Sequence, residues 1–292
     1  MLIIYFKLIQ VIESLINLIL VLVYIVIRFV NGQHIVKNNR FNQLINILGN
    51  GPSLKQDEPK IIEQTSKSGN FVMVVNMFAT TELFEKIKPN FYIIADMAFF
   101  QKTKSGRIEF QKEKLFSDLE KKTSWSMDLM IPRSAKNSNV LNKLKNNKLI
   151  RFSYYNNYPI MGGFQNLNNL FFKFNLANPL YQNVLIAAIF SSMKLGFKNI
   201  YLWGADHSWH EGFKINNDNQ ISTLDLHFYD EKQTNGFVHC KHDGTQINVF
   251  EEFSMLSRTF QVYHCIEKYA KTVGVKIINR SYISWIDAFE KK

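Results

Sequence analysis

Cysteine is nearly absent from this chain, because only Cys240 and Cys265 occur among its 292 residues. Two cysteines are too few for a disulfide scaffold and wrongly spaced for a zinc knuckle, so we expect the protein to work in a reducing compartment. The sequence also contains neither a Walker lysine loop nor a GxGxxG fingerprint. This argues against a P-loop ATPase and against a dehydrogenase with the common dinucleotide-binding motif.

Apolar residues are plentiful, with 46% hydrophobic residues that include 25 Phe and 12 Tyr, which excludes disorder for most of the chain. The formal net charge is +11, and the stretch from Lys102 to Arg151 alone holds 13 basic and 5 acidic residues. Since no DNA or RNA module accompanies this charge, we expect no nucleic-acid partner. We interpret the stretch as a solvated helical face that can also attract anionic lipid.

The first 30 residues are almost entirely apolar and are long enough to cross a membrane. We therefore predict an N-terminal membrane anchor helix over residues 1–30, a linker over 31–43 and one α/β domain over 44–292. No signal-peptidase site follows the apolar run, so we expect the anchor to be retained. An interfacial amphipathic helix stays open as an alternative, because Lys7, Glu13, Asn17 and Arg28 could partly line one side.

Basic residues follow the apolar segment and predict its orientation. Arg28, Lys37, Arg40 and Lys55 come after it, whereas only Lys7 and the amino terminus precede its centre. By the positive-inside rule this predicts a single-pass protein of the inner, cytoplasmic membrane whose catalytic domain faces the cytoplasm.

Short β-branched runs alternate with helical periods after residue 44, which predicts a Rossmann-like, mostly parallel sheet with helices on both faces. We expect two segments, Gln101–Lys148 and Trp209–Asp243, to form loops over the site, and Phe289–Lys292 to be a solvated tail. The clearest helices are Asn183–Leu195 and Phe250–Val273. The predicted strands are Leu44–Leu48, Phe71–Val75, Phe91–Ala95, Leu129–Ile131, Leu149–Phe152, Asn199–Trp203 and Val275–Ile278.

Ligands of parallel sheets bind beyond the carboxyl ends of the strands, so the residues at those ends are the candidate site. The first strand runs into Gly49-Asn50-Gly51-Pro52-Ser53, where Gly51 permits a sharp turn and Ser53 can cap a helix whose free amides attract phosphate. An ordinary tight turn is the alternative. The later strands end in polar side chains that can bind ribose or sugar hydroxyls or cap the next helices: Asn76, Asp96, Asp206, His207 and Ser208.

These segments together resemble a known family. The Gly49–Leu54 motif, the strand ending in Asn76 and the run from Leu195 to Asp206 are similar to bacterial CMP-sialic acid sialyltransferases and to related proteins that include hydroxymethylpterin pyrophosphokinase-like members. The resemblance covers about Leu44 to Trp209, and residues 278–287 resemble the last strand and helix. It implies a GT-A-like variant of the fold and a nucleotide-sugar donor as substrate, without a further cofactor.

The resemblance also implies roles for individual residues. Asn50, Gly51, Ser53 and Asn76 would hold the nucleotide, and a loop histidine, His242 or its neighbour His239, would be the catalytic base. Two departures bear on the donor sugar. The family's Thr-Ser-Gly at the start of the long helix is replaced by Asn183-Val184-Leu185, and its tyrosine after the Gly-x-Asp strand tip is replaced by Ser208.

Chemistry assigns the remaining candidates. Asp96, Asp206 and Ser208 would orient the substrate, and His207 is the rival of His242 as base. No Asp-x-Asp pair occurs in the sequence, so we expect catalysis without a metal. A metal site stays open as an alternative, because His207 and His210, like His239 and His242, are spaced by three residues.

We therefore expect a membrane-anchored glycosyltransferase that modifies a surface glycan or a lipid-linked precursor. Its partners would be the nucleotide-sugar donor, a glycan or glycolipid acceptor and the membrane, and a homo-oligomer is left open. Two alternatives remain: a pterin pyrophosphokinase-like enzyme that uses ATP, and a catalytically silent scaffold in polysaccharide assembly.

Overall fold

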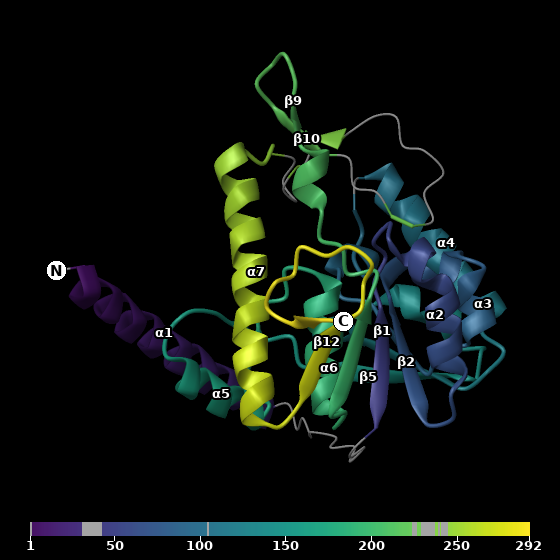
Figure 1. Cartoon of the computed structure of the whole chain (residues 1–292), viewed down its shortest axis with the longest axis horizontal. Coiled ribbons are helices and arrows are strands. Elements are labelled where there is room, and N and C mark those ends of the chain that lie inside the picture. Colours follow the sequence, from purple (N-terminus) through teal and green to yellow (C-terminus); the bar gives the residue numbers. More distant parts are fainter. Residues whose placement is uncertain are drawn as a thin grey trace.

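The fold is an α/β domain built on a central sheet, preceded by one long apolar helix (Figure 1). The computed structural model describes residues 2–30, 43–103, 105–223, 227–228, 237–238, 240 and 245–292. The central sheet has eight strands in the order β13-β12-β8-β1-β2-β3-β4-β5, and every neighbouring pair in it is parallel. The expected Rossmann-like, mostly parallel sheet is thus confirmed.

All seven predicted strands are present, with ends that differ from the prediction by up to three residues. The strands of the central sheet are β1 Leu44–Leu48, β2 Asn70–Val75, β3 Phe91–Ile93, β4 Met127–Pro132, β5 Ile150–Tyr155, β8 Asn199–Trp203, β12 Lys276–Asn279 and β13 Glu290–Lys291. Short strands outside it are β6 Pro159–Ile160, β7 Asn178–Pro179, β9 Lys214–Ile215, β10 Ile221–Thr223 and β11 Phe237–Val238.

Helices cover both faces of the sheet (Figure 1). The bounds are α1 Leu2–Val30, α2 Leu54–Ser66, α3 Leu83–Ile87, α4 Gly106–Lys122, α5 Gln165–Lys173, α6 Val184–Lys194 and α7 Val249–Thr272, with 3₁₀ turns at Asn76–Thr80, Met97–Phe99, Arg133–Ala135, Asn139–Leu144 and Trp209–Gly212. Buried side chains of α2, α3 and α4 form one core layer, and those of α5, α6 and α7 form the other. Because the inner strands of the sheet are covered on both faces, their sequences are mostly apolar, as in β1 and β2.

Two expectations about irregular segments are wrong. The Gln101–Lys148 segment is not a loop over the site, because it contains α4 and β4 and its apolar residues Leu115, Phe116 and Leu119 are buried. The chain end is not a free tail, since Glu290–Lys291 pairs in parallel with β12. Phe289 is buried beside this edge strand and anchors it, although the two strand residues themselves are exposed.

The topological switch point of the sheet lies between β1 and β8. From β1 the chain adds strands toward β5 at one edge, and from β8 it adds β12 and β13 at the other edge. In sheets of this kind the loops diverge at the switch point and leave a crevice beyond the carboxyl ends of the strands. The loops after β1 and β8 carry the Gly49–Ser53 motif and the Gly204–Ser208 motif.

Helix α1 meets the length and hydropathy needed to cross a membrane over Leu2–Ile27. It does not stand apart from the domain, because its second half packs beside α5 (Figure 1). Asn17 donates to the carbonyl oxygen of Gly162 at 3.2 Å, and Val21 is buried in the same core layer as α5 and α6.

Candidate functional site

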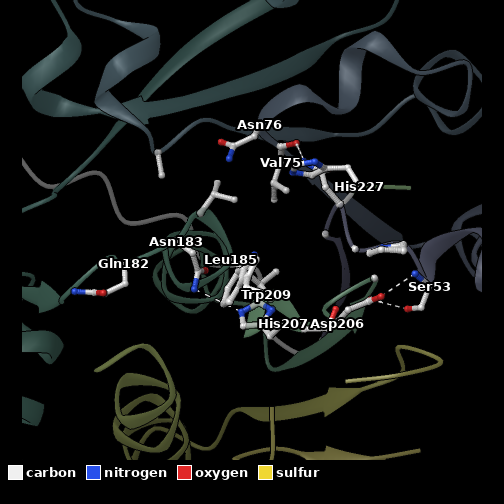
Figure 2. Close-up of a pocket in the computed structure, with 18 of the residues that line it drawn as sticks. Ser53, Val75, Asn76, Gln182, Asn183, Leu185, Asp206, His207, Trp209 and His227 are labelled. Carbon is white, nitrogen blue, oxygen red and sulfur yellow. Dashed lines mark hydrogen bonds between the residues drawn. The ribbon is translucent and has the colours of Figure 1, made fainter. Parts of the chain in front are cut away.

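A cavity of about 960 Å³ opens at the carboxyl ends of β1, β2, β3 and β8 (Figure 2). Its walls contain eight of the candidate residues that the sequence predicts. Those in the walls are Asn50, Gly51, Ser53, Asn76, Asp96, Asp206, His207 and Ser208. The predicted base His242 and its neighbour His239 lie outside the described residues.

The loops after β1 and β8 interlock at the floor of the cavity. The Gly51 amide donates to the Gly204 carbonyl at 2.9 Å, and the Gly49 amide donates to the Trp203 carbonyl at 2.8 Å. A Cβ atom on Gly51 would lie 2.3 Å from Asp206 Oδ1. Only glycine therefore permits this approach of the two loops, which gives the sequence motif its physical reason.

Ser53 does not cap α2 with its side chain, so that expectation is wrong. Its Oγ donates to Asp206 Oδ1 at 2.6 Å, and its amide donates to Asp206 Oδ2 at 2.8 Å. Burial raises the pKa of Asp206, while the two Ser53 hydrogen bonds act in the opposite direction. The Ser53 amide thus donates to a carboxylate of the chain itself. Asp206 lies where the sequence motif predicts a phosphate of the ligand.

Two amide oxygens in the cavity wall are buried and have no hydrogen-bond partner among the described residues. They are Asn50 Oδ1 and Asn76 Oδ1. The Asn50 amide orientation is defined, because its Nδ2 donates to the Val75 carbonyl at 3.3 Å. A buried acceptor without a partner costs about 1–3 kcal/mol, so these two oxygens are polar groups that a ligand could satisfy.

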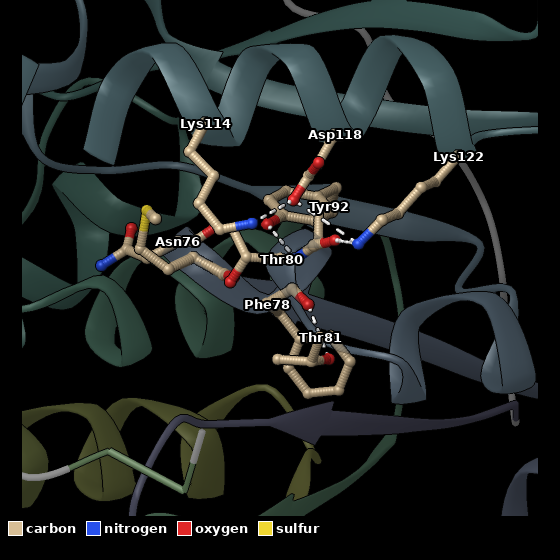
Figure 3. A network of polar contacts seen from close by, with 10 residues as sticks. Asn76, Phe78, Thr80, Thr81, Tyr92, Lys114, Asp118 and Lys122 are labelled. Atoms are coloured by element: carbon tan, nitrogen blue, oxygen red, sulfur yellow. Dashed lines mark hydrogen bonds and ion pairs between the residues drawn. The ribbon is translucent and has the colours of Figure 1, made fainter. Parts of the chain in front are cut away.

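Asn76 is held by a polar network behind the cavity (Figure 3). Its backbone has φ of 44°, in the left-handed region that asparagine tolerates better than most residues. The Tyr92 hydroxyl accepts from the Ala79 amide at 2.9 Å and donates to the Asn76 carbonyl. Lys122 of α4 donates to the Ala79 carbonyl at 2.9 Å. The turn after β2 is thus fixed from β3 and α4, which holds the Asn76 backbone in place.

His207 lies at the opposite wall and belongs to a buried chain of hydrogen bonds. Asn183 caps α6, because its Oδ1 accepts from the Ile186 amide at 3.1 Å. The same oxygen accepts from the Tyr263 hydroxyl at 3.1 Å, so the Tyr263 oxygen is left to accept from His207 Nε2 at 2.6 Å. This network places the ring proton of His207 on Nε2 and leaves the lone pair on Nδ1. Asn183 Nδ2 lies 3.5 Å from His207 Nε2, but both atoms are then donors, so they form no hydrogen bond.

Burial lowers the pKa of His207 to about 3. The ring is therefore neutral at physiological pH, and it packs at a tilt of 44° against Trp209 with a centroid distance of 4.3 Å. A base with so low a pKa is a weak proton acceptor at neutral pH. The site geometry suits His207 as a hydrogen-bond acceptor that orients a ligand better than as a general base.

The other two substrate candidates occupy the rim. Asp96 is exposed and its Oδ1 accepts from the Ala98 amide at 2.8 Å, so it caps the 3₁₀ turn that follows β3. Ser208 is half-buried in the wall beside His207. Both side chains border the cavity, and their predicted contacts with substrate stay predictions.

Sequence reasoning missed several residues of the wall. His227 lies across the cavity from His207, on the same side as Asn76 (Figure 2). Its neighbour Phe228 is buried against Phe78 with a centroid distance of 5.5 Å, and the Phe228 amide donates to the Asn50 carbonyl at 3.0 Å. In the sequence, His227 lies in a predicted loop segment and has no assigned role, and the anchoring of Phe228 reveals its position. Tyr181, Gln182 and Ile283 are among the other wall residues that the sequence analysis did not single out.

No metal centre is assembled in the part of the chain that the structure describes, where no group of three or more His, Cys, Asp or Glu side chains converges. His210 packs edge-on against Trp285 at 4.2 Å between centroids, whereas His207 packs against Trp209 and Tyr263. The spacing of His207 and His210 is therefore explained by two separate aromatic contacts. The second histidine pair lies outside the described residues.

Comparison with protein-family models and with curated proteins finds no match for this chain.

Proposed function

We propose that the protein is a glycosyltransferase that takes its sugar from a nucleotide-activated, CMP-linked donor, in a GT-A-like, sialyltransferase-like variant of its α/β fold. The observation that carries the proposal is the pair of buried acceptors without a partner, Asn50 Oδ1 and Asn76 Oδ1, in a cavity of about 960 Å³ at the switch point of the sheet. A cavity of this size is suited to a nucleotide-sized ligand.

The two amide oxygens accept hydrogen bonds, so the ligand must offer donors to them. An exocyclic amino group, as in cytosine, and ribose hydroxyls are such donors. Because each oxygen is buried without a partner, a ligand that supplies a donor removes the cost of leaving that acceptor unpaired. This favours the nucleoside end of the donor beside Asn50 and Asn76.

The described wall of the cavity contains no Lys or Arg, so the leaving phosphate must be stabilised in another way. The N-cap Asn183 and the first two residues of α6, Val184 and Leu185, line the cavity. Helix α6 has 11 residues, and its dipole is positive at this end. The amide of Ser53 at the start of α2 is already used by Asp206. We therefore assign the phosphate to the start of α6 instead of the Gly49–Ser53 motif.

A histidine would act as base in a metal-independent transfer. It would take the proton of the acceptor hydroxyl while the acceptor oxygen bonds to the anomeric carbon and the bond from that carbon to the phosphate oxygen breaks, releasing the nucleotide. His242 is the predicted base, and His227 now joins it because it lines the cavity. His207 would orient the substrate through Nδ1, with Asp96, Asp206 and Ser208 in the surrounding wall.

The acceptor would be a surface glycan or a lipid-linked precursor at the membrane to which α1 attaches the domain. Arg28 lies in the last turn of α1, Lys37 and Arg40 follow the helix in sequence, and this basic charge favours the cytoplasmic face of the inner membrane. The start of α6 in the wall also permits a pyrophosphokinase-like reaction with ATP, which is the second candidate function.

Donor cleavage tests the proposal. The full chain in detergent should release CMP from CMP-sialic acid or a related CMP-sugar, and His242→Ala or His227→Ala should abolish the release while leaving the melting temperature unchanged. His264→Ala is the matched control, because His264 is a half-exposed histidine of α7 outside the cavity wall. If the chain cleaves ATP in the presence of a pterin and does not cleave CMP-sugars, the glycosyltransferase proposal is wrong and the pyrophosphokinase-like function is favoured. Full function in a glycan-assembly assay with every histidine variant would identify a scaffold.

A further inference from the structure

Polar residues of α1 gather on the side that faces the domain. Glu13, Ser14 and Asn17 follow one another at helical spacing, and all three contact the loop between β6 and α5. Glu13 Oε2 accepts from the Gly163 amide at 2.7 Å, and Ser14 Oγ accepts from the Phe164 amide at 2.8 Å. The polar groups that interrupt the apolar run are therefore used in docking α1 to the domain.

The docked region is long and closely fitted. Tyr24 stacks on Tyr158 with a centroid distance of 4.6 Å, so contact extends from Glu13 to Tyr24. A Cβ atom on Gly162, which has φ of 71°, would lie 2.5 Å from the Glu13 carboxyl carbon. Glycine at this position is thus required for the helix to approach the loop.

Docking leaves too little free helix for a crossing. The undocked part, Leu2–Ile12, has 11 residues and a length of about 16 Å at 1.5 Å per residue, whereas the hydrocarbon core is about 30 Å thick. A crossing by α1 would therefore draw the β6–α5 loop and α5 into the core. Lys173 and Phe174 end that helix in exposed positions, and lysine is strongly disfavoured in the core.

The side of α1 opposite the docked face is apolar along its whole length. Six exposed residues alternate there at spacings of four and three: Leu8, Ile12, Leu15, Ile19, Leu22 and Val26. A second copy of the chain could cover such a seam as a coiled coil, but coiled coils place charged residues beside the seam. Here the flanking positions are also exposed or half-buried and apolar: Ile9, Val11, Ile16, Leu18, Val23 and Ile25. A dimer seam would leave them in water, whereas lipid covers the whole arc.

We propose that α1 lies flat in one leaflet of the membrane, with its apolar arc in the acyl chains and the domain seated on its polar side. The arc from Leu8 to Val26 extends over about 28 Å along the leaflet. Lys7 lies on the free end of the helix, where its charge reaches anionic headgroups. This arrangement replaces the single crossing that the apolar length alone predicts, and it holds the mouth of the cavity at a constant height above the lipid. It does not depend on the proposed function.

Depth measurements on the full chain in liposomes of phosphatidylcholine and phosphatidylglycerol test the proposal. Nitroxide labels would be placed singly at Leu8, Leu15 and Leu22, with Cys240 and Cys265 replaced by Ser. A flat helix gives the same ratio of oxygen to nickel-chelate accessibility at all three positions, within about twofold. A crossing helix changes depth by about 10 Å between successive labels, which would overturn the proposal. Spin–spin coupling between copies, with low oxygen accessibility at Leu15, would overturn it in favour of a second copy.

Hydrogen exchange tests the docking that the proposal requires. Gly162→Ala should abolish the protection of the Gly163 and Phe164 amides, because the new Cβ pushes Glu13 away. Gly69→Ala is the matched control, since Gly69 has φ of 84° and no atom within 4 Å of an added Cβ. Equal protection in the two variants would contradict the docking of α1 and the flat orientation derived from it.

Discussion

Replacing Asn76 with glycine should stabilise the protein and abolish nucleotide binding. The change removes a buried acceptor without a partner, worth about 1–3 kcal/mol, and relieves the left-handed backbone at φ of 44°. Glycine loses about 0.5–1 kcal/mol more conformational entropy on folding. We expect the free energy of unfolding to rise by about 1–2 kcal/mol, which corresponds to a melting temperature about 2–8 °C higher.

Urea unfolding and thermal melting of the full chain in detergent measure this effect, each with and without CMP. Asn219→Gly is the matched control, because Asn219 also has a positive φ of 57° but is exposed in the β9–β10 turn. The control should change stability by less than about 0.5 kcal/mol, as exposed substitutions usually do, and respond to CMP as the unmodified chain does. The reasoning is refuted if Asn76→Gly is destabilised, or if it is more stable and still binds CMP normally.

Three further predictions concern groups around the cavity. Because burial lowers the pKa of His207 to about 3, neutral His207 contributes to the free energy of unfolding above pH 6.5. This contribution is lost as the pH falls toward 3, and the free energy of unfolding should already be about 2 kcal/mol lower at pH 5. In urea unfolding at a series of pH values, His207→Asn should remove this decrease. Burial raises the pKa of Asp57, so the protonated side chain contributes to the free energy of unfolding below pH 3.8, and this contribution is lost as the pH rises through the raised pKa. By urea unfolding, Asp57→Asn should therefore be more stable than the unmodified chain at pH 7 and equal to it at pH 3. Tyr92→Phe removes the hydroxyl that accepts from the Ala79 amide and donates to the Asn76 carbonyl. Calorimetry should show a free energy of unfolding that is lower by about 1–3 kcal/mol, and titration should show weaker CMP binding. An unchanged CMP affinity would contradict the positioning of Asn76 by Tyr92.

The sheet could be predicted from the sequence because its strands are short apolar runs bounded by turns. Leu44–Leu48 and Asn199–Trp203 were predicted with their observed ends, since both are followed directly by glycine-containing turns. The edge strand Glu290–Lys291 was missed, because it has only two residues and both are charged. Its position depends on the burial of Phe289, which no local pattern reveals.

The candidate site could be predicted as a set of residues but not as a set of roles. Strand ends identify Asn50, Asn76 and Asp206 as neighbours, and the cavity contains all three. The bond between Ser53 and Asp206 joins residues 153 positions apart, so the sequence could not show that the carboxylate already occupies the start of α2. Likewise Glu13 and Gly163 are 150 positions apart. From the sequence around it, Glu13 is only a charged residue that interrupts an apolar helix, so its partner could not be predicted.

Nucleotide-dependent melting of the full chain tests the central claim most directly, that the cavity beyond β1 and β2 binds a nucleotide through Asn50 and Asn76. At a hundred times its dissociation constant CMP should add about 2.7 kcal/mol, a melting shift of about 5–11 °C, with and without divalent metal. UDP, GDP and ATP should shift it less, and Asn76→Gly should remove the CMP shift. A melting temperature that none of the four nucleotides changes would contradict the account.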